Sequence, residues 1–218
     1  MIKSGSRMGP RGEHSRDEFV RLVIDTAEAI GRAEGLRGLG MRRIAAAIGY
    51  APNSIYNAIG GLDEIILRLN ARTLGRLHEQ LSGLMSERRN PKARVLRLAD
   101  GYLDFVAEEP RLWSLLFDHM MAGEAALPDW YEAALRQATD LVDQALLPVI
   151  TDPVERARAV TALWAALHGL AVLSSSGKLA IVSRDDPRRL ARLLIGGFLD
   201  GFDPPGDAHP QPSPQGRG

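Results

Sequence analysis

The sequence predicts an all-α protein with two helical parts. Along most of its 218 residues, apolar side chains recur three and four positions apart, which is the period of one face of a helix. No stretch alternates apolar and polar residues with β-branched side chains, so we expect no sheet. Three dipeptides place a capping residue before a proline and so mark helix starts: Asn90-Pro91, Asp152-Pro153 and Asp186-Pro187.

The first helix is expected to begin just after Ser15. Ser15 and Glu18 have the spacing of a capping box, in which each side chain bonds to the backbone of the other residue. The residues that follow lie on one face at helical spacing: Phe19, Leu22, Val23, Thr26, Ala27 and Ile30.

Residues 40–59 are typical of two short helices joined by a tight turn. Gly49 follows the first helix, where a left-handed residue that only glycine adopts cheaply is common. Pro52 suits the first position of the next helix. Each helix has one apolar face, formed by Ile44, Ala45 and Ile48 and then by Ile55, Tyr56 and Ile59. Because helices this short need a third helix to pack on, residues 16–61 should form one three-helix domain.

Three short motifs in this region together carry a resemblance to a known protein family. An Arg-x-Ile-Ala-x-x-x-Gly run covers residues 42–49, Ser54-Ile55-Tyr56 follows it, and Gly61 with the acidic pair Asp63-Glu64 precedes the next helix. In these motifs the region resembles the DNA-binding domain of the TetR family of transcriptional regulators. The resemblance implies a helix-turn-helix whose second short helix enters the major groove of DNA. It also implies a long helix from Asp63 that links this head to the body.

The resemblance assigns DNA contacts to one set of residues: Arg42, Arg43, Pro52, Asn53, Ser54, Tyr56 and Asn57. Asn53 and Ser54 are expected to reach base edges, and Tyr56 to brace the DNA backbone. The chain departs from the family at Ala58 and Leu62, where the family often has a histidine and a lysine that contact phosphate. Weaker nonspecific affinity for DNA is therefore expected.

The two ends of the chain are expected to lie outside the packed domains. Residues 1–15 form a flexible basic leader, which fits either a DNA-contacting arm or a plain disordered terminus. Residues 1–60 carry nine Lys or Arg against six Asp or Glu, whereas the whole chain has no formal net charge. This small local excess favours the head as the part that meets nucleic acid. Residues 203–218 are rich in proline and glycine and should form a disordered tail.

Residues 62–202 are expected to form a helical effector-binding and dimerisation domain. Aromatic residues gather between Tyr102 and Met121, and further on Trp164 lies one turn before His168-Gly169. Together these segments resemble the TetR-type C-terminal domain named for its Trp-His-Gly motif, which implies a dimer that holds a small effector. From the residues alone, His168 fits either a core histidine bonded to a backbone carbonyl or a polar contact to that effector.

Within residues 62–202 we predict two sets of functional residues, one for a pocket and one for a dimer interface. The candidate pocket consists of aromatic residues with two methionines and one histidine: Trp113, Phe117, Met120, Met121, Trp130, Tyr131, Trp164 and His168. Residues of these types also form plain core. The candidate dimer interface comes from the last two long helices: Leu163, Leu170, Leu190, Leu194, Gly197 and Phe198. Its alternative is that both apolar stripes pack within one subunit.

Composition and motifs exclude several classes of protein. The chain has no cysteine, no His-Glu-x-x-His, no phosphate loop and no Gly-x-Ser-x-Gly elbow, so we expect no metal, no cofactor and no enzyme. We find no leader-like or long uncharged apolar stretch and expect a cytoplasmic protein without a membrane segment. The sequence thus predicts a homodimeric repressor that a small apolar or amphipathic effector releases from a palindromic operator in double-stranded DNA. The alternative is a ligand-carrier or protein-interaction module of the same fold that does not read DNA.

Overall fold

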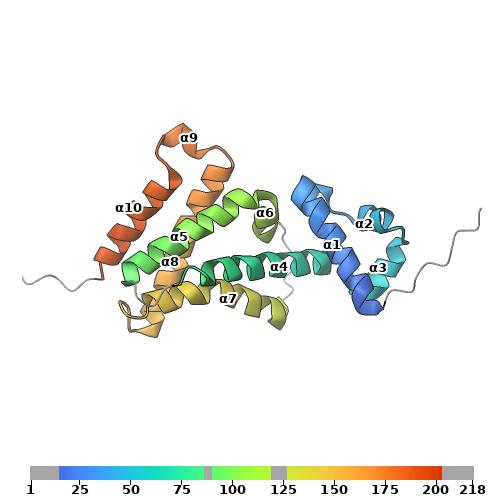
Figure 1. Ribbon diagram of the computed structural model, residues 1–218, viewed down its shortest axis with the longest axis horizontal. Coiled ribbons are helices and arrows are strands. Elements are labelled where there is room, and N and C mark those ends of the chain that lie inside the picture. The colour runs from blue at the N-terminus through green and yellow to red at the C-terminus, as the bar shows by residue number, and fades with distance from the viewer. Residues whose placement is uncertain (1–14, 86–89, 119–126, 203–218) are drawn as a thin grey trace, which may run out of the picture. The chain divides into compact units, whose positions relative to one another are not determined.

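The computed structural model describes residues 15–85, 90–118 and 127–202. Within these ranges it contains ten α-helices, one short 3-10 helix and no strand, so the prediction of an all-α fold is confirmed (Figure 1). The leader up to residue 14, Met120, Met121 and the tail from residue 203 lie outside the described residues.

The chain divides into two compact units. The first comprises Met1–Thr73 and Glu109–Glu132, and the second comprises Leu74–Glu108 and Ala133–Gly218. Helices α4 (Leu62–Ser82) and α7 (Asp129–Leu146) have residues in both units. The division therefore does not follow the single boundary expected at residue 61. The reason is that Ile65, Ile66 and Leu69 on α4 belong to the same core as α1.

The first unit is built around one apolar core. It contains α1 (Arg16–Glu34), η1 (Leu36–Gly38), α2 (Met41–Ile48), α3 (Pro52–Ile59), the first half of α4, and α6 (Pro110–Asp118). The core residues come from the α-helices of this unit and from Leu39, which follows η1: Phe19, Val23, Ile24, Ala27, Leu39, Ile44, Ala45, Ile55, Ile65, Ile66, Leu69, Leu112 and Leu115. This common core holds the short helices α2 and α3 in place, as helices of eight residues require.

The helix boundaries of this unit follow from local capping. Glu18 N–H donates to Ser15 Oγ at 3.3 Å and Ser15 N–H donates to Glu18 Oε2 at 2.8 Å, which is the predicted capping box. Gly49 ends α2 in the left-handed conformation, with φ 74° and ψ 27°. The next amide, that of Tyr50, donates to the carbonyl of Ala45 at 3.0 Å, which closes the turn. Both predictions are confirmed.

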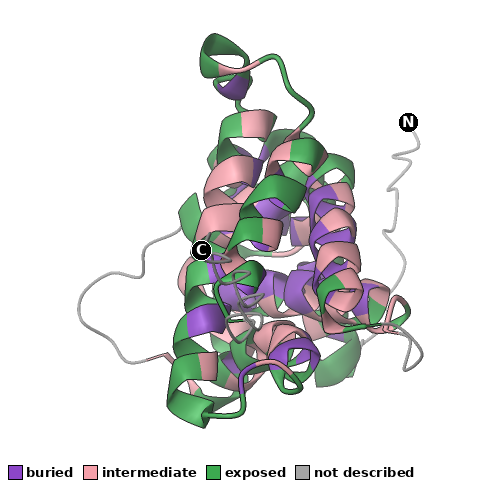
Figure 2. Cartoon of the chain, turned by 90° about the vertical axis from the view of Figure 1, so that its left-hand side faces the viewer, coloured by how far each residue is buried: buried purple, intermediate pink, exposed green. Residues whose placement is uncertain are grey.

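The second unit is a bundle of longer helices. It contains the second half of α4, α5 (Pro91–Glu108), most of α7, α8 (Pro153–Ser175), α9 (Leu179–Val182) and α10 (Pro187–Asp200). The three predicted caps are present: Asn90 accepts from the amide of Ala93, Asp152 from that of Val154, and Asp186 from that of Arg188. Figure 2 shows buried residues on the inner faces of these helices and exposed residues on their outer faces.

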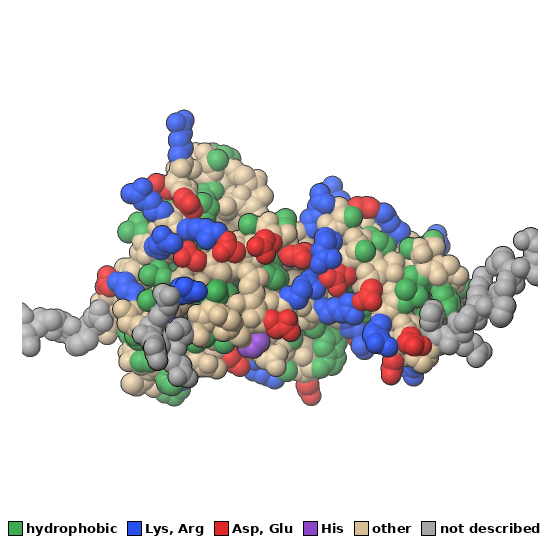
Figure 3. Space-filling model, viewed as in Figure 1, with side chains coloured by type: hydrophobic (Ala, Val, Ile, Leu, Met, Phe, Trp, Pro, Cys, Tyr) green, Lys and Arg blue, Asp and Glu red, His purple; other side chains and the backbone are tan. Residues whose placement is uncertain are grey.

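Ion pairs join α5 to α10. Arg188 pairs with Asp104, Arg192 Nη2 lies 2.9 Å from Asp100 Oδ2, and Lys92 pairs with Asp200. As the residue number on α5 falls from 104 to 92, the number of its partner on α10 rises from 188 to 200, so the two helices run antiparallel. Charged side chains of both signs lie side by side over these helices in Figure 3. We name these three ion pairs the α5–α10 ladder.

Helix α8 corrects one expectation. By length and composition it could cross a membrane, because residues 159–175 carry no Asp, Glu, Lys or Arg. The view that the chain lacks a long uncharged apolar stretch was therefore wrong. The core helix of a soluble protein passes the same test but is mostly buried, whereas only 22% of this apolar window is buried inside the protein. Much of α8 is therefore exposed in the single chain.

Candidate functional site

Helix α3 presents a polar face to solvent. Ile55 is fully buried in the core of the first unit and fixes the helix from below. On the other side Pro52, Asn53 and Asn57 are exposed, and the ring of Tyr56 is 64% exposed. Five of the seven predicted DNA-contact residues lie on this helix, and of these Ser54 alone is half-buried. The helix therefore offers amide, hydroxyl and phenol groups on an anchored support.

The two arginines of α2 differ in their surroundings. Arg42 is exposed, and no hydrogen bond or ion pair joins it to another described residue. Arg43 pairs with Glu34 at the end of α1, with Nη1 2.5 Å from Oε2, and this bond lowers the pKa of the Glu34 carboxyl. Arg43 would have to break its bond with Glu34 before it could contact a phosphate.

Arg16 lies at α3 as well. It opens α1, and its Nη2 donates to the carbonyl of Ala58 at 3.4 Å, at the end of α3 where the helix dipole favours a cation. This contact of Arg16 was not predicted from the sequence. Its position immediately after the capping serine was the available signal, since the first helical residue cannot belong to a free arm.

The predicted pocket residues fall into two groups. Trp113, Phe117, Trp130 and Tyr131 belong to the first unit, whereas Trp164 and His168 belong to the second. Trp113 and Tyr131 are buried, with Trp113 and Phe117 ring centroids 5.1 Å apart. Burial raises the pKa of the Tyr131 phenol. A single pocket built from all six described residues therefore has no support within either unit.

Two buried polar residues of α4 were missed by the sequence analysis. Asn70 Nδ2 donates to the carbonyl of Leu115 at 3.3 Å, and Thr73 Oγ1 donates to the carbonyl of Leu69 at 3.0 Å. Both side chains are almost fully buried, beside the core that contains Leu115. A pattern of apolar spacing carries no signal for such positions, because it treats polar residues as solvent-facing.

In the second unit, Trp164 and His168 stack. Their ring centroids lie 5.2 Å apart at an interplanar angle of 23°, and the Tyr102 hydroxyl lies 3.3 Å from His168 Nδ1. Burial lowers the pKa of the His168 imidazole. Trp164 and His168 therefore share one face of α8, and that face is not buried, since Trp164 is 42% exposed. Helix α8 has apolar residues on several sides, so its stripe could not identify the core side.

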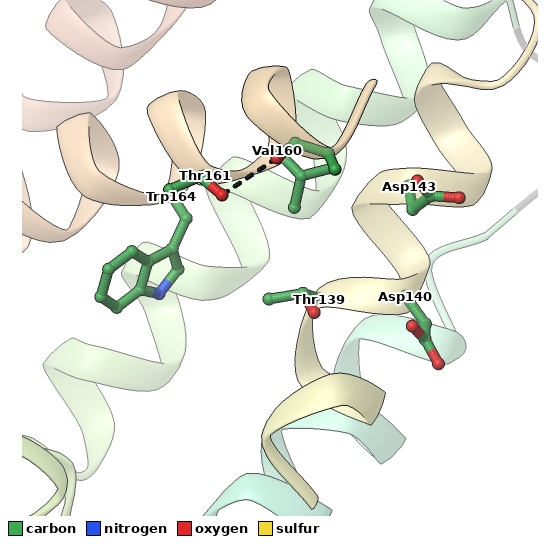
Figure 4. A pocket seen from close by; sticks show the side chains of 7 residues that line it. Thr139, Asp140, Asp143, Val160, Thr161 and Trp164 are labelled. Atoms are coloured by element: carbon green, nitrogen blue, oxygen red, sulfur yellow. Dashed lines mark hydrogen bonds between the residues drawn. The ribbon is translucent and has the colours of Figure 1, made fainter. Parts of the chain in front are cut away.

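A groove lies next to this pair, between α7 and α8. It has a volume of about 290 Å³ and is lined by Thr139, Asp140, Asp143, Val160, Thr161 and Trp164 (Figure 4). Asp143 accepts a hydrogen bond from Arg156 Nε at 2.8 Å, and Thr161 donates to the carbonyl of Ala157 at 2.9 Å. The indole of Trp164 forms one wall. The groove thus combines an aromatic surface with carboxylates and hydroxyls.

The predicted interface residues are exposed to different degrees. Leu194 and Gly197 are exposed, and Leu170, Leu190 and Phe198 are half-buried. Leu163 is only 5% exposed and packs inside its own unit, so its side chain is little available to a partner, and the interface itself stays a prediction. Three further apolar residues of the same two helices are exposed: Val172, Leu173 and Leu193, the last 75% exposed.

The described residues contain no group of three or more His, Cys, Asp or Glu side chains that could hold a metal ion. The exposed polar face of α3 is the candidate site of the first unit.

Comparisons with known proteins agree with this geometry. Residues 95–198 match the model of the tetracyclin repressor-like C-terminal domain. A curated relative, the uncharacterized helix-turn-helix-type transcriptional regulator YobS of Bacillus subtilis, is 27% identical over 195 residues, which are 84% of this chain and 91% of the relative.

Solved structures share the fold. A protein of unknown function from Rhodococcus sp. RHA1 superposes with a TM-score of 0.68 at 20% identity, covering 88% of this chain and 97% of the other. A TetR-like transcriptional regulator from the same organism superposes with a TM-score of 0.59 at 19% identity, covering 87% and 100%. Residues 95–198 are thus similar to a tetracyclin repressor-like C-terminal domain, most of the chain is similar to a helix-turn-helix-type transcriptional regulator, and the chain shares the all-helical fold of TetR-like structures.

Proposed function

We propose that this protein is a repressor that binds a palindromic operator as a homodimer and is released by a small effector. The observation that carries the proposal is α3, which is anchored by fully buried Ile55 and presents Asn53, Tyr56 and Asn57 to solvent. A recognition helix needs this combination, because it must keep its geometry while its polar face enters the major groove.

The roles of the α3 residues follow from their chemistry. Asn53 and Ser54 stand in the first turn, where a recognition helix meets base edges, and an asparagine can bond to both hydrogen-bonding groups of an adenine. Tyr56 presents a phenol suited to phosphate. Exposed Arg42 supplies a charge for the DNA backbone, whereas Arg43 must first leave Glu34.

The dimer is proposed to form through α8 and α10. Exposed apolar side chains lie on both helices, among them Val172, Leu173, Leu193 and Leu194. A second copy of the chain would cover them, which also accounts for the low burial of the apolar window of α8 in a cytoplasmic protein. A Cβ added at Gly197 meets no atom within 4 Å, so a larger residue fits the protomer and disturbs only a partner.

Gly197→Leu therefore tests the interface without unfolding the protomer. Sedimentation velocity should show a dimer for the wild type and a shift toward monomer for the variant. Leu135→Gln on α7 is the matched control, because it alters an exposed apolar residue on another helix and should leave the dimer intact. A fully dimeric Gly197→Leu variant would exclude this face.

The effector is proposed to bind at the α7–α8 groove beside Trp164. The groove is small, at the lower end of the range for ligand pockets, and its aromatic wall suits a small apolar or amphipathic molecule. The stack of Trp164 on His168 agrees with a body of the Trp-His-Gly type. An effector that binds one conformer of the dimer more tightly would lower operator affinity by that difference, and α4, with residues in both units, is the proposed lever.

Selection of DNA from a pool of random duplexes tests the function. The wild type should enrich an inverted repeat, with affinity that falls steeply as salt increases. Asn53→Ala should lose or relax the selected sequence, whereas Gln144→Ala, an exposed amide on α7, should select the same sequence as the wild type.

Absence of any enriched sequence would favour the alternative of a ligand-carrier or protein-interaction module. That alternative has some support in Ala58 and Leu62, which replace two phosphate-contacting residues found in many members of the family.

A further inference from the structure

A second groove lies in the first unit, apart from the proposed effector groove. It has a volume of about 450 Å³ and runs between α1, the first half of α4 and the start of α7. Its apolar floor consists of Val20, Ile24 and Ala71, while three arginines and Trp130 complete the lining. Trp130 and Trp164, which were predicted to line one effector pocket, line two different grooves.

The three arginines are Arg21, Arg68 and Arg72. Arg21 is exposed, and no hydrogen bond or ion pair joins it to another described residue. Arg21 is therefore a cation at the groove whose charge is not paired with a described residue. A charge that serves only solubility does not need to lie beside an apolar surface.

Arg72 is held in position by two carboxylates, and some of its hydrogen-bond donors remain available. Its Nη1 donates to Asp25 Oδ1 at 2.5 Å and to Glu28 Oε2 at 3.2 Å. Both hydrogen bonds use the same nitrogen, so Nε and Nη2 make no bond to a described residue. A guanidinium fixed in this way loses little side-chain entropy when it binds an anion with its remaining donors.

Arg68 and Trp130 form the aromatic side. The Arg68 guanidinium carbon lies 5.8 Å from the centroid of the Trp130 ring, and Arg68 Nε donates to Glu64 at 2.8 Å. The indole of Trp130 is 41% exposed. An exposed indole beside a guanidinium offers a flat surface on which a planar ring can stack.

We propose that this groove binds a small planar aromatic anion, such as an aromatic carboxylate, sulfonate or phosphate. The rings lie on the apolar floor against Trp130, and the anionic group accepts hydrogen bonds from Arg21 and Arg72. A neutral aromatic molecule of the same shape leaves those donors without an acceptor. This site lies in the unit that carries α3, so it goes beyond the repressor proposal and requires neither DNA nor the α7–α8 groove.

Two fluorescent probes with the same rings test the site. The anion is 1-anilinonaphthalene-8-sulfonate, and the neutral partner is N-phenyl-1-naphthylamine, which lacks the sulfonate. The sulfonate probe should bind the full-length protein more tightly than the neutral probe, and excitation of tryptophan should transfer energy to it. Trp130→Phe keeps a stacking ring and should reduce this transfer more than Trp164→Phe does, because Trp164 lines another groove.

Arg21→Gln localises the charge. Because Arg21 makes no bond to a described residue, the variant should fold like the wild type, as circular dichroism can verify. Affinity for the sulfonate probe should fall about fivefold and affinity for the neutral probe should not change. Arg37→Gln is the matched control, since Arg37 is also exposed, makes no bond to a described residue and lies in the same unit but outside the groove.

Equal affinity of Arg21→Gln and Arg37→Gln for the sulfonate probe would overturn the proposal. So would energy transfer that falls no more in Trp130→Phe than in Trp164→Phe. Neither readout involves DNA, so failure here is distinguishable from failure of the repressor proposal.

Discussion

Replacement of Gly49 by alanine should destabilise the helix-turn-helix through its backbone alone. Gly49 sits at φ 74° between α2 and α3, in the left-handed region that side chains disfavour. A Cβ added there meets no atom within 4 Å, so the substitution creates no steric clash with a neighbour. The change therefore isolates the conformational requirement of the turn that sets the angle between the two helices.

The expected magnitude combines two opposing effects. An L-residue in the left-handed conformation costs roughly 1–2 kcal/mol. Alanine also restricts the unfolded chain, which returns about 0.4–1 kcal/mol. The net loss should be about 1 kcal/mol, which corresponds to a Tm lower by about 2–4 °C for a chain of this size. Gly49→Asn should lose less, because asparagine tolerates this conformation better than alanine does.

Thermal unfolding followed by circular dichroism measures the effect. The control is Gly75→Ala, the same chemical change in the interior of α4, where an added Cβ also meets nothing within 4 Å. That variant should gain stability by about 1 kcal/mol, since alanine favours a helix over glycine by this amount. The reasoning would be refuted by a Gly49→Ala variant as stable as the wild type, or by a Gly75→Ala variant that is less stable.

Two further predictions concern the second unit. A double-mutant cycle with Arg188→Gln and Asp104→Asn should give a coupling of at most about 1 kcal/mol that disappears in 1 M salt, since both side chains are about two-fifths exposed; coupling that persists in salt would contradict this. Burial lowers the pKa of His168, so the unfolded chain takes up a proton first as pH falls. Its contribution to stability is complete above about pH 6.5 and is lost as pH falls through the lower folded pKa. Melting curves from pH 8 to pH 5 should therefore fall more for the wild type than for His168→Gln, and parallel curves would contradict this.

The features that the sequence predicted correctly are local. The capping box of Ser15 and Glu18, the left-handed Gly49 and the cap of Asp152 each depend on residues within a few positions of one another. Backbone amides at a helix start need an acceptor, and a nearby Ser, Asp or Asn supplies it wherever the chain folds. Such features can be identified without knowledge of the tertiary structure.

The features that the sequence did not predict depend on packing. Leu163 and Leu193 occur in similar apolar stripes, yet the first is buried and the second is largely exposed. Helix α8 is apolar on several sides, so spacing alone cannot decide which side faces the core. Trp130 and Trp164 look alike in the sequence but line different grooves in different units. The aromatic residues of a sequence indicate that a ligand-binding surface is available, but not which of these residues line the same groove.

The most direct test of the central claim is the dependence of DNA affinity on half-site spacing. Fluorescence anisotropy would compare the selected inverted repeat with a duplex that has about five extra base pairs between its halves, roughly half a helical turn. If two α3 helices read successive major grooves, the insertion should reduce affinity to that of a single half-site, and Tyr56→Ala should weaken binding to both duplexes. Equal affinity for the two duplexes, or binding that Tyr56→Ala leaves unchanged, would contradict the assignment of α3 as the DNA-reading helix of a dimer.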